Sequence, residues 1–385
     1  MISLEQSPIT TKVSSPDEST RFTLDGSKEL ETRIGKMCSE IRDGVRGIVV
    51  ESKLEGILLG GGYGRGEGGV MRNGTKDYPY NDLEFYVFVS GNRFLNRLRY
   101  EPALHHLADA ITPRAGLEVE FDVISIEYLR HSPRSMFYYD LVMGHQLLWG
   151  DEHLLDGCEH HRQAARLPTS EATRLMMNRC TGLLFAREKL ARDKFSPEDA
   201  DFVGRNLAKA QLACGDAILT ALGEYHWSCR ERHVRLKSLA AEEDSPWLDE
   251  VRRHHAEGLE FKLHPRVCSD SAAALAPRFQ AISDLTRQVW LWLESRRFDQ
   301  PFNSITEYLS ANQNGSDNRC WRNRLFTARA FGLSTMFQSE ACRHPRERVM
   351  ADLASLLWQG ETSLNRSASC AARLAQFRKA WQRVR

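Results

Sequence analysis

The sequence lacks an excess of charge of either sign. Its 52 lysines and arginines are balanced by 51 aspartates and glutamates, which leaves a formal net charge of +1. This balance excludes a global basic field that would attract nucleic acid or an anionic membrane, while a local basic face stays compatible with it. No apolar run approaches the roughly 18 residues of a transmembrane helix, and the N-terminal residues lack the features of a signal peptide. We therefore expect a cytoplasmic protein with no membrane partner and no nucleic-acid partner.

The chain also lacks an organised cysteine pattern. Its nine cysteines are an odd number, lie scattered from Cys38 to Cys370 and include no CxxC pair. Neither a disulfide framework nor a zinc ribbon is indicated, and we predict reduced thiols throughout. The stretch "CEHH" at 158–161 has no second ligand pair at zinc-site spacing, so no metal site is expected there.

Large apolar residues are scarce at the N-terminus. Residues 1–27 are rich in serine, threonine and proline, a composition that cannot bury enough apolar surface to offset the entropy of ordering. We predict a disordered tail over this range. From residue 28 onward, apolar residues recur at three-to-four spacing, which predicts an amphipathic helix that packs on a sheet. These residues are Leu30, Ile34, Met37, Ile41 and Val45.

Three strand-like segments follow this helix. They are "LEGILLG", "LEFYVFVS" and "LEVEFDVISI", and the last alternates strictly between polar and apolar residues. The helical segment "FLNRLRYEPALHHLADAIT" lies between the second and the third. This order predicts an α+β domain over residues 28–165, with a small mixed sheet flanked by helices.

Strand-like alternation stops after Leu167, and segments with helical period take over. One of them has Ser196 as an N-cap, Pro197 in its first turn and Gly223 as its stop. We predict an all-α helical bundle over residues 166–385.

Aromatic residues and histidines of this second half are expected to have ordinary structural roles. We predict that Trp290 and Trp292 pack in the core. We predict that the adjacent His254 and His255 diverge on a helix and face solvent.

The segment "GGYGRGEGG" at 61–69 places six glycines in nine positions. Glycine leaves the backbone bare, so that its amides can approach and cradle phosphate oxygens. We therefore interpret this loop as a candidate phosphate-binding turn.

Carboxylates follow the glycine loop at strand spacing. Asp82 and Glu84 are two residues apart in a strand and so point to one face, and Glu118, Glu120 and Asp122 share a face of the next strand in the same way. Carboxylates on one sheet edge repel each other, and a divalent cation such as Mg²⁺ relieves that repulsion. A glycine turn beside such a cluster is typical of nucleoside triphosphate chemistry.

Together, "GGYGRGE", "NDLEFYVFV" and "EFDVIS" resemble the nucleotidyltransferase fold of the DNA polymerase beta superfamily. The resemblance covers about residues 28–155 and is strongest to bacterial members with a helical partner domain, including the aminoglycoside nucleotidyltransferases. "GHQLLWGD" at 144–151 is similar to a segment that often closes this domain. Two features depart from the family pattern. Gly62 stands where a serine is common, and nineteen residues, more than usual, separate Gly62 from Asp82, so that "VMRNGTKDYPY" is interpreted as an inserted hairpin tip or loop.

The resemblance implies roles for five residues. Gly61 and Gly62 would meet a nucleoside triphosphate, with ATP the expected donor. Asp82 and Glu84 would bind Mg²⁺ in a two-metal site. Asp122 would be the third ligand and the base for the acceptor hydroxyl. We prefer it to the neighbouring glutamate because the family's third carboxylate commonly precedes two apolar residues.

Three further charged residues are left with alternatives. Arg65 either faces phosphate or braces the loop. Lys209 and Asp216 lie seven positions apart and share a helix face. Lys209 is a candidate for contact with the nucleotide, and a structural ion pair is an equally good interpretation of the two residues.

These residues imply transfer of a nucleoside monophosphate from a triphosphate to a hydroxyl acceptor, with release of pyrophosphate. The acceptor is either a small molecule, such as an aminoglycoside, or a protein. The alternative is a non-catalytic nucleotide-binding or regulatory protein on the same scaffold. Modification of RNA ends would need a basic groove that the near-neutral charge does not support.

Overall fold

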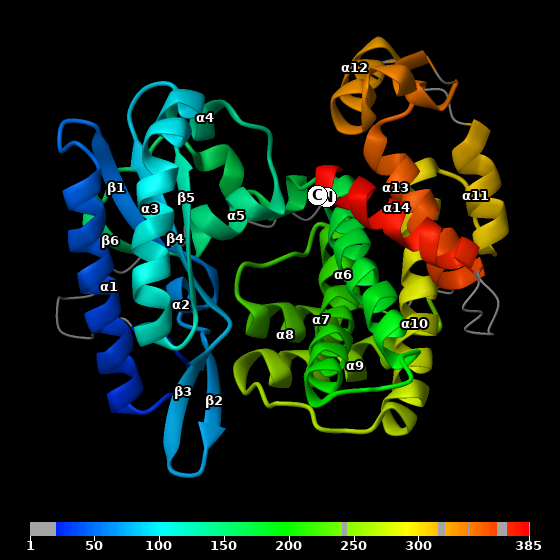
Figure 1. The fold of residues 1–385 in the computed structure, drawn as a ribbon, viewed down its shortest axis with the longest axis horizontal. Coiled ribbons are helices and arrows are strands. Elements are labelled where there is room, and N and C mark those ends of the chain that lie inside the picture. The colour runs from blue at the N-terminus through cyan, green and yellow to red at the C-terminus, as the bar shows by residue number, and fades with distance from the viewer. Residues whose placement is uncertain (1–20, 241–244, 315–319, 338, 360–367, 385) are drawn as a thin grey trace, which may run out of the picture.

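The computed structural model describes residues 21–240, 245–314, 320–337, 339–359 and 368–384. In Figure 1 the strands and the first helices form one part of the molecule, and the helices from α6 onward form a second part beside it. The predicted tail at residues 1–20 lies outside the described residues.

One four-stranded sheet organises the first part. Its order is β5-β4-β1-β6, with β4 and β5 parallel and the other neighbours antiparallel. It is thus a small mixed sheet, and the three predicted strands are β1, β4 and β5. The strand bounds are β1 Leu54–Leu59, β4 Asp82–Val89, β5 Glu118–Ile124 and β6 Gln146–Gly150.

Alternation along β4 divides its side chains between two cores. Leu83 and Phe85 pack with residues of α1 and α3, whereas Tyr86 and Phe88 pack on the opposite face with residues of α4 and α5. The prediction that the first helix packs on a sheet is confirmed. The helix bounds are α1 Lys28–Ile48, α3 Arg93–Ala115, α4 Ile126–His131 and α5 Met136–Met143.

The long segment between the glycine loop and β4 forms a hairpin, as predicted. Its strands are β2 Gly69–Asn73 and β3 Lys76–Tyr80. The Tyr63 hydroxyl, from the glycine loop, lies 2.9 Å from the Gly69 carbonyl oxygen and 3.1 Å from that of Tyr80. The Tyr80 ring packs edge-on against Phe261 at 6.2 Å between centroids. The hairpin therefore connects the glycine loop to helix α9 of the second part.

Among the described residues of the second part, every regular element is a helix or a helical turn. Ser196 caps α7 and forms a capping box with Asp199, because each side chain bonds the other's backbone N–H. Trp290 and Trp292 are buried in the helical core, which confirms their predicted packing role. The helices are α6 Thr169–Leu190, α7 Pro197–Ala221, α8 Cys229–Ser238, α9 Leu248–Leu263, α10 Ala272–Phe298, α11 Ile305–Asn314, α12 Cys320–Phe331, α13 Pro345–Ala354 and α14 Ala368–Val384.

Residues 21–27, assigned by composition to the tail, belong to the fold. Thr23 is buried and forms an isolated bridge with Gly68. The Glu31 carboxylate accepts hydrogen bonds from the backbone N–H groups of Phe22 and Thr23, at 2.8 and 3.0 Å. The prediction of a tail is wrong for this stretch because specific pairing, together with packing of Phe22 on the core beside the sheet, orders it.

The two adjacent histidines of α9 are buried, so the prediction that they face solvent is wrong. His254 Nδ1 lies 2.7 Å from Gln211 Nε2, and His255 Nε2 lies 3.2 Å from Asp216 Oδ1. A Cβ at Gly215 of α7 would collide with the His255 ring. The close approach of α7 and α9 at this glycine encloses both histidines.

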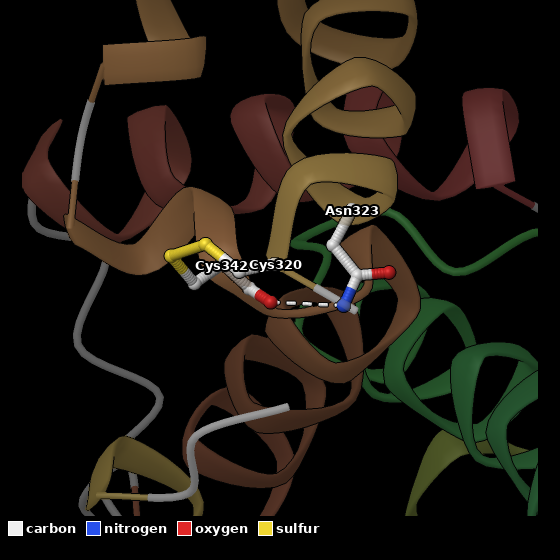
Figure 2. Close-up of a disulfide and its surroundings, with 3 residues drawn as sticks. All are labelled: Cys320, Asn323 and Cys342. Carbon is white, nitrogen blue, oxygen red and sulfur yellow. Dashed lines mark hydrogen bonds between the residues drawn. A yellow bond between two sulfur atoms is a disulfide. The ribbon is translucent and has the colours of Figure 1, made fainter. Parts of the chain in front are cut away.

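Cys320 and Cys342 form a disulfide, so the prediction of reduced thiols is wrong for this pair. The bridge joins the first residue of α12 to the last residue of a 3₁₀ turn, η4 Ser339–Cys342. Figure 2 shows the Asn323 side chain, which donates a 2.8 Å hydrogen bond to the Cys342 carbonyl oxygen beside the bridge. The two half-cystines are 22 positions apart without any motif, which is why spacing did not reveal the pair.

Among the residues that the structure describes, no helix is both long enough and apolar enough to span a membrane. The buried apolar residues group by region. One large cluster draws on residues 172–384, and two clusters beside the sheet draw on residues 30–158.

Candidate functional site

Five carboxylates occupy one face of the sheet, and we call them the acidic face. In the parallel register Asp82 lies opposite Glu118, Glu84 opposite Glu120 and Tyr86 opposite Asp122. This is the face on which Tyr86 and Ile124 pack with α4 and α5. The acidic face is Asp82, Glu84, Glu118, Glu120 and Asp122.

The carboxylates of this face that lie near the start of β4 repel one another. Burial raises the pKa of Asp82, and Glu84 raises it further. Burial likewise raises the pKa of Glu120, with Asp82, Glu118 and Glu84 adding to the effect. These carboxylates therefore lack sufficient positive charge among their neighbours, which is the condition that a bound cation would relieve.

Asp122 lies farther along β5 than the residue that faces Glu84. Burial raises the pKa of Asp122, and Arg97 and Arg93 on α3 oppose this. The residue directly across from Glu84 is Glu120, which the resemblance ranked second. By register, Glu120 is therefore the better third carboxylate beside Asp82 and Glu84, while the role of Asp122 as base stays a prediction.

The glycine loop lies directly against the acidic face. It folds into one short helical turn, α2 Gly61–Gly64. Gly61 has φ +60°, and a Cβ built there would lie 2.5 Å from Glu84 Oε1. A Cβ at Gly60 would collide with the Tyr86 ring, and one at Gly64 with the Leu59 carbonyl oxygen.

Packing within the protein thus requires glycine at these positions whether or not a ligand binds. The sequence interpretation attributed their number to the approach of phosphate, whereas packing against Glu84 and β1 accounts for Gly61 and Gly64. The loop keeps unused donors, however. Within the described part of the chain, no hydrogen bond engages the backbone N–H groups of Gly61, Gly62 and Tyr63.

Arg65 braces the loop. Its side chain is buried, and Nη1 forms an ion pair with Asp140 Oδ2 on α5 at 3.2 Å. Burial lowers the pKa of Arg65, but Asp140, Tyr225 and Glu84 together outweigh it, so that the pKa is raised. The same Asp140 oxygen accepts a 3.2 Å hydrogen bond from the Tyr225 hydroxyl, to which Arg232 donates. The structure shows Arg65 in the bracing role, while its contact with phosphate stays a prediction.

Glu67 is a site residue that sequence reasoning missed. Its carboxylate is 2% exposed and accepts hydrogen bonds from the Ser228 hydroxyl at 2.5 Å and the Cys229 N–H at 2.9 Å. Burial raises its pKa, but these bonds prevail and lower it to about 2. The carboxylate thus caps the N-terminus of α8 and fixes the glycine loop to the helical part. The only sequence signal was an acidic residue within a glycine run.

Three cations of the helical part are grouped around Lys209, which lies within electrostatic range of Asp82, and we call them the cation group. They are Arg179 on α6, Lys209 on α7 and Lys262 on α9. Desolvation lowers the pKa of each. For Lys209, Arg179 and Lys262 lower the pKa further, and Asp82 acts in the opposite direction.

The cation group and the acidic face influence each other without touching. Among the described residues, Arg179, Lys209 and Lys262 form no ion pair within the 4.0 Å that defines one. Lys209 nonetheless lowers the pKa of Asp82. The negative charge of Asp82 and the positive charge of Lys209 thus both remain available to a ligand that carries charges of both signs.

Lys209 and Asp216 do not pair with each other. Asp216 Oδ1 is 3.1 Å from Arg232 Nε and 3.2 Å from His255 Nε2, inside the helical part. The interpretation of Lys209 and Asp216 as an ion pair is therefore wrong, because Asp216 pairs with Arg232 and His255 instead. Lys209 stays the candidate for contact with the nucleotide.

The residues present fit a magnesium ion that is completed by its substrate. In the described ranges, no group of three or more His, Cys, Asp or Glu side chains is placed to hold a metal by itself. Mg²⁺ commonly takes one or two protein carboxylates and completes its shell with substrate phosphates and water. Asp82 and Glu84, side by side on one face of the sheet, supply that number.

Comparison with known proteins gives no match to a protein-family model, to a curated protein or to a solved structure.

Proposed function

We propose that the protein is a magnesium-dependent nucleotidyltransferase that moves a nucleoside monophosphate from a triphosphate, with ATP the expected donor, to a hydroxyl acceptor. The single observation that carries this proposal is the placement of Asp82 and Lys209 within electrostatic range of each other beside the glycine loop. Each alters the pKa of the other without an ion pair. A metal-bound triphosphate carries both complementary charges.

The chain's own residues would divide the work. Asp82 and Glu84 would hold Mg²⁺, which when bound lowers the pKa of the attacking hydroxyl and neutralises the leaving group. The free amides of Gly61 and Gly62, together with Lys209, would bind phosphate oxygens.

The reaction is an in-line displacement. The acceptor oxygen forms a bond to the α-phosphorus, the bond from that phosphorus to the oxygen bridging to the β-phosphate breaks, and pyrophosphate leaves. The acceptor proton passes to a carboxylate, for which Asp122 is the predicted base and Glu120 the neighbour of Glu84. The acceptor is a small hydroxylated molecule or a protein.

The test is incubation with each labelled nucleoside triphosphate, magnesium and a cell extract, followed by a search for the component that acquires label. The protein itself is included as an acceptor. Label transfer with pyrophosphate release supports the proposal, and the absence of transfer from every triphosphate contradicts it.

Asp82→Asn is the matched variant. Because the pKa of Asp82 is raised in the fold, its charge is unfavourable there and the substitution should not lower the free energy of unfolding. Transfer should fall by more than the roughly 10- to 100-fold that loss of an outer-shell partner causes. Asp109→Asn, exposed on α3, is the control and should transfer normally. Normal turnover by Asp82→Asn would refute the metal assignment.

One observation favours the second candidate, a non-catalytic nucleotide-binding protein. One oxygen of Glu84 is already engaged, since Oε2 accepts a 2.7 Å hydrogen bond from the Tyr86 hydroxyl. Magnesium-dependent binding of nucleotide without release of pyrophosphate would establish that function instead.

A further inference from the structure

Helix α12 has its amphipathicity inverted. Asn323 and Thr327 are each 3% exposed, whereas Trp321 is 68% and Leu325 53% exposed. A helix on a globular protein normally buries its apolar stripe and exposes its polar one. In α12 the uncharged Asn323 and Thr327 instead face the protein, whereas Trp321, Leu325 and Phe326 face outward. Phe331, at the end of the helix, packs against the helical core.

The neighbouring 3₁₀ turn, η3 Leu333–Phe337, extends this apolar surface. Leu333 and Phe337, at 76% and 78%, are the most exposed large apolar side chains of the described residues. We call the combined set the α12 surface, and it consists of Trp321, Leu325, Phe326, Leu333 and Phe337. Large apolar side chains exposed together on two elements in contact, as here, mark candidate interaction sites.

The α12 surface is held in place from within. The disulfide between Cys320 and Cys342 and the hydrogen bond from Asn323 tie the start of α12 to η4 (Figure 2). In Figure 1, α12 lies at an outer edge of the helical part. The apolar residues therefore lie on a fixed projection from the molecule.

The charge around this surface is strongly positive. Residues 320–348 contain six arginines and two glutamates, a net charge of +4 in a chain whose total is +1. Arg322 and Arg329 on α12 are exposed, and neither forms an ion pair with another described residue. The near-neutral total conceals this local basic region.

We propose that the α12 surface docks on an anionic phospholipid bilayer. Trp, Phe and Leu side chains flanked by arginines are the composition that inserts at the headgroup boundary, with the guanidinium groups on lipid phosphates. A second copy of the chain fits less well, because a twofold contact would bring two regions of charge +4 together. Nucleic acid would engage the arginines but leaves the exposed Leu325 and Leu333 without a stacking role. This proposal departs from the expectation of no membrane partner, which came from the total charge.

The test is sedimentation of the full chain with vesicles. We expect binding to vesicles of phosphatidylcholine mixed with phosphatidylserine, and at least tenfold weaker binding to phosphatidylcholine alone. Trp321→Ser combined with Leu333→Ser and Phe337→Ser should reduce binding at least tenfold. Because all three side chains are exposed, circular dichroism should show an intact fold.

The control carries the same kind of change elsewhere on the surface. Phe94→Ser with Leu98→Ser removes exposed apolar side chains from α3 and should bind vesicles as the parent chain does. Failure of the parent chain to bind, equal binding to neutral vesicles, or unchanged binding by the triple variant overturns the proposal. So does a dimer, or binding of single-stranded RNA, that the triple variant abolishes while vesicle binding persists.

Discussion

At the scale of single residues, the glycine loop is defined by what it touches. Gly61 lies against Glu84, and Glu67 reaches across to Ser228 and Cys229. Through these contacts the loop fixes the position of α8 relative to the acidic face. Two predictions follow from these contacts, one for stability and one for binding.

Glu67→Gln should lower stability in a pH-dependent way. The pKa of Glu67 falls from an ordinary 4.5 to about 2 on folding, so its carboxylate contributes about 3 kcal/mol of stability at neutral pH. Because the folded pKa is the lower one, this contribution is present above the unfolded pKa and disappears as the pH falls from about 4.5 towards 2. Urea unfolding from pH 7 to pH 3 should show a smaller acid-induced loss for Glu67→Gln than for the parent chain. The exposed Glu51→Gln should change neither curve.

Gly61→Ala should reduce nucleotide binding, and Gly74→Ala should not. The two glycines have nearly equal φ angles, +60° and +62°, so an L-residue costs about 1–2 kcal/mol at either one. At Gly61 the new Cβ would also displace Glu84, whereas at Gly74, in the hairpin turn, nothing lies within 4 Å. Calorimetric titration with magnesium and ATP should show a weaker affinity for Gly61→Ala than for Gly74→Ala. Equal affinities would show that Glu84 and the loop play no part in binding.

At the scale of elements, the segment from α12 to η4 is a small unit of its own. The disulfide closes a separation of 22 residues, and the helix it anchors buries Asn323 rather than an apolar stripe. Apolar burial contributes little to holding such an element, so covalent and polar ties carry more of its stability than they do in α7 or α10.

Cys320→Ser with Cys342→Ser should destabilise this unit selectively. A cross-link of this loop length contributes about 3 kcal/mol by restricting the unfolded chain. Hydrogen exchange should therefore accelerate in residues 320–342 and remain unchanged in β1 and β4. Unaltered exchange at α12 would mean that the bond from Asn323 and the contacts of α12 suffice without the bridge.

At the scale of the whole molecule, two parts bring opposite charges together. The sheet contributes the acidic face, and α6, α7 and α9 contribute the cation group. Neither part has the full set of ligands for a metal-bound triphosphate. The fixed contacts between them, Glu67 with α8 and Tyr80 with Phe261, place the two sets near each other.

Lys209→Met should weaken nucleotide binding without loss of stability. The pKa of Lys209 is lowered in the fold, so its positive charge is unfavourable there and its removal should not reduce the free energy of unfolding. Loss of one phosphate contact should weaken magnesium-ATP binding about tenfold, or about 1.4 kcal/mol. Lys237→Met, exposed on α8, serves as the control. A stable Lys209→Met that binds as tightly as the parent chain would remove this residue from the site.

Much of the fold could be predicted from local pattern. Period-two alternation in β4 and β5, the apolar stripe of α1 and the cap of α7 each arise from residues close in sequence, where backbone geometry dictates which side chains share a face. The pairing of Asp82 with Glu84 on one face followed in the same way. The boundary between residues 165 and 166 and the nucleotidyltransferase activity stay predictions.

Contacts between distant segments were decided only by the tertiary structure. The burial of His255, the placement of Glu120 opposite Glu84, the brace between Arg65 and Asp140 and the outward face of α12 each depend on which element packs against which. Local pattern states which residues share a face but not what that face meets. Only packing turned a near-neutral sequence into an acidic face, a separate cation group and a basic apolar projection.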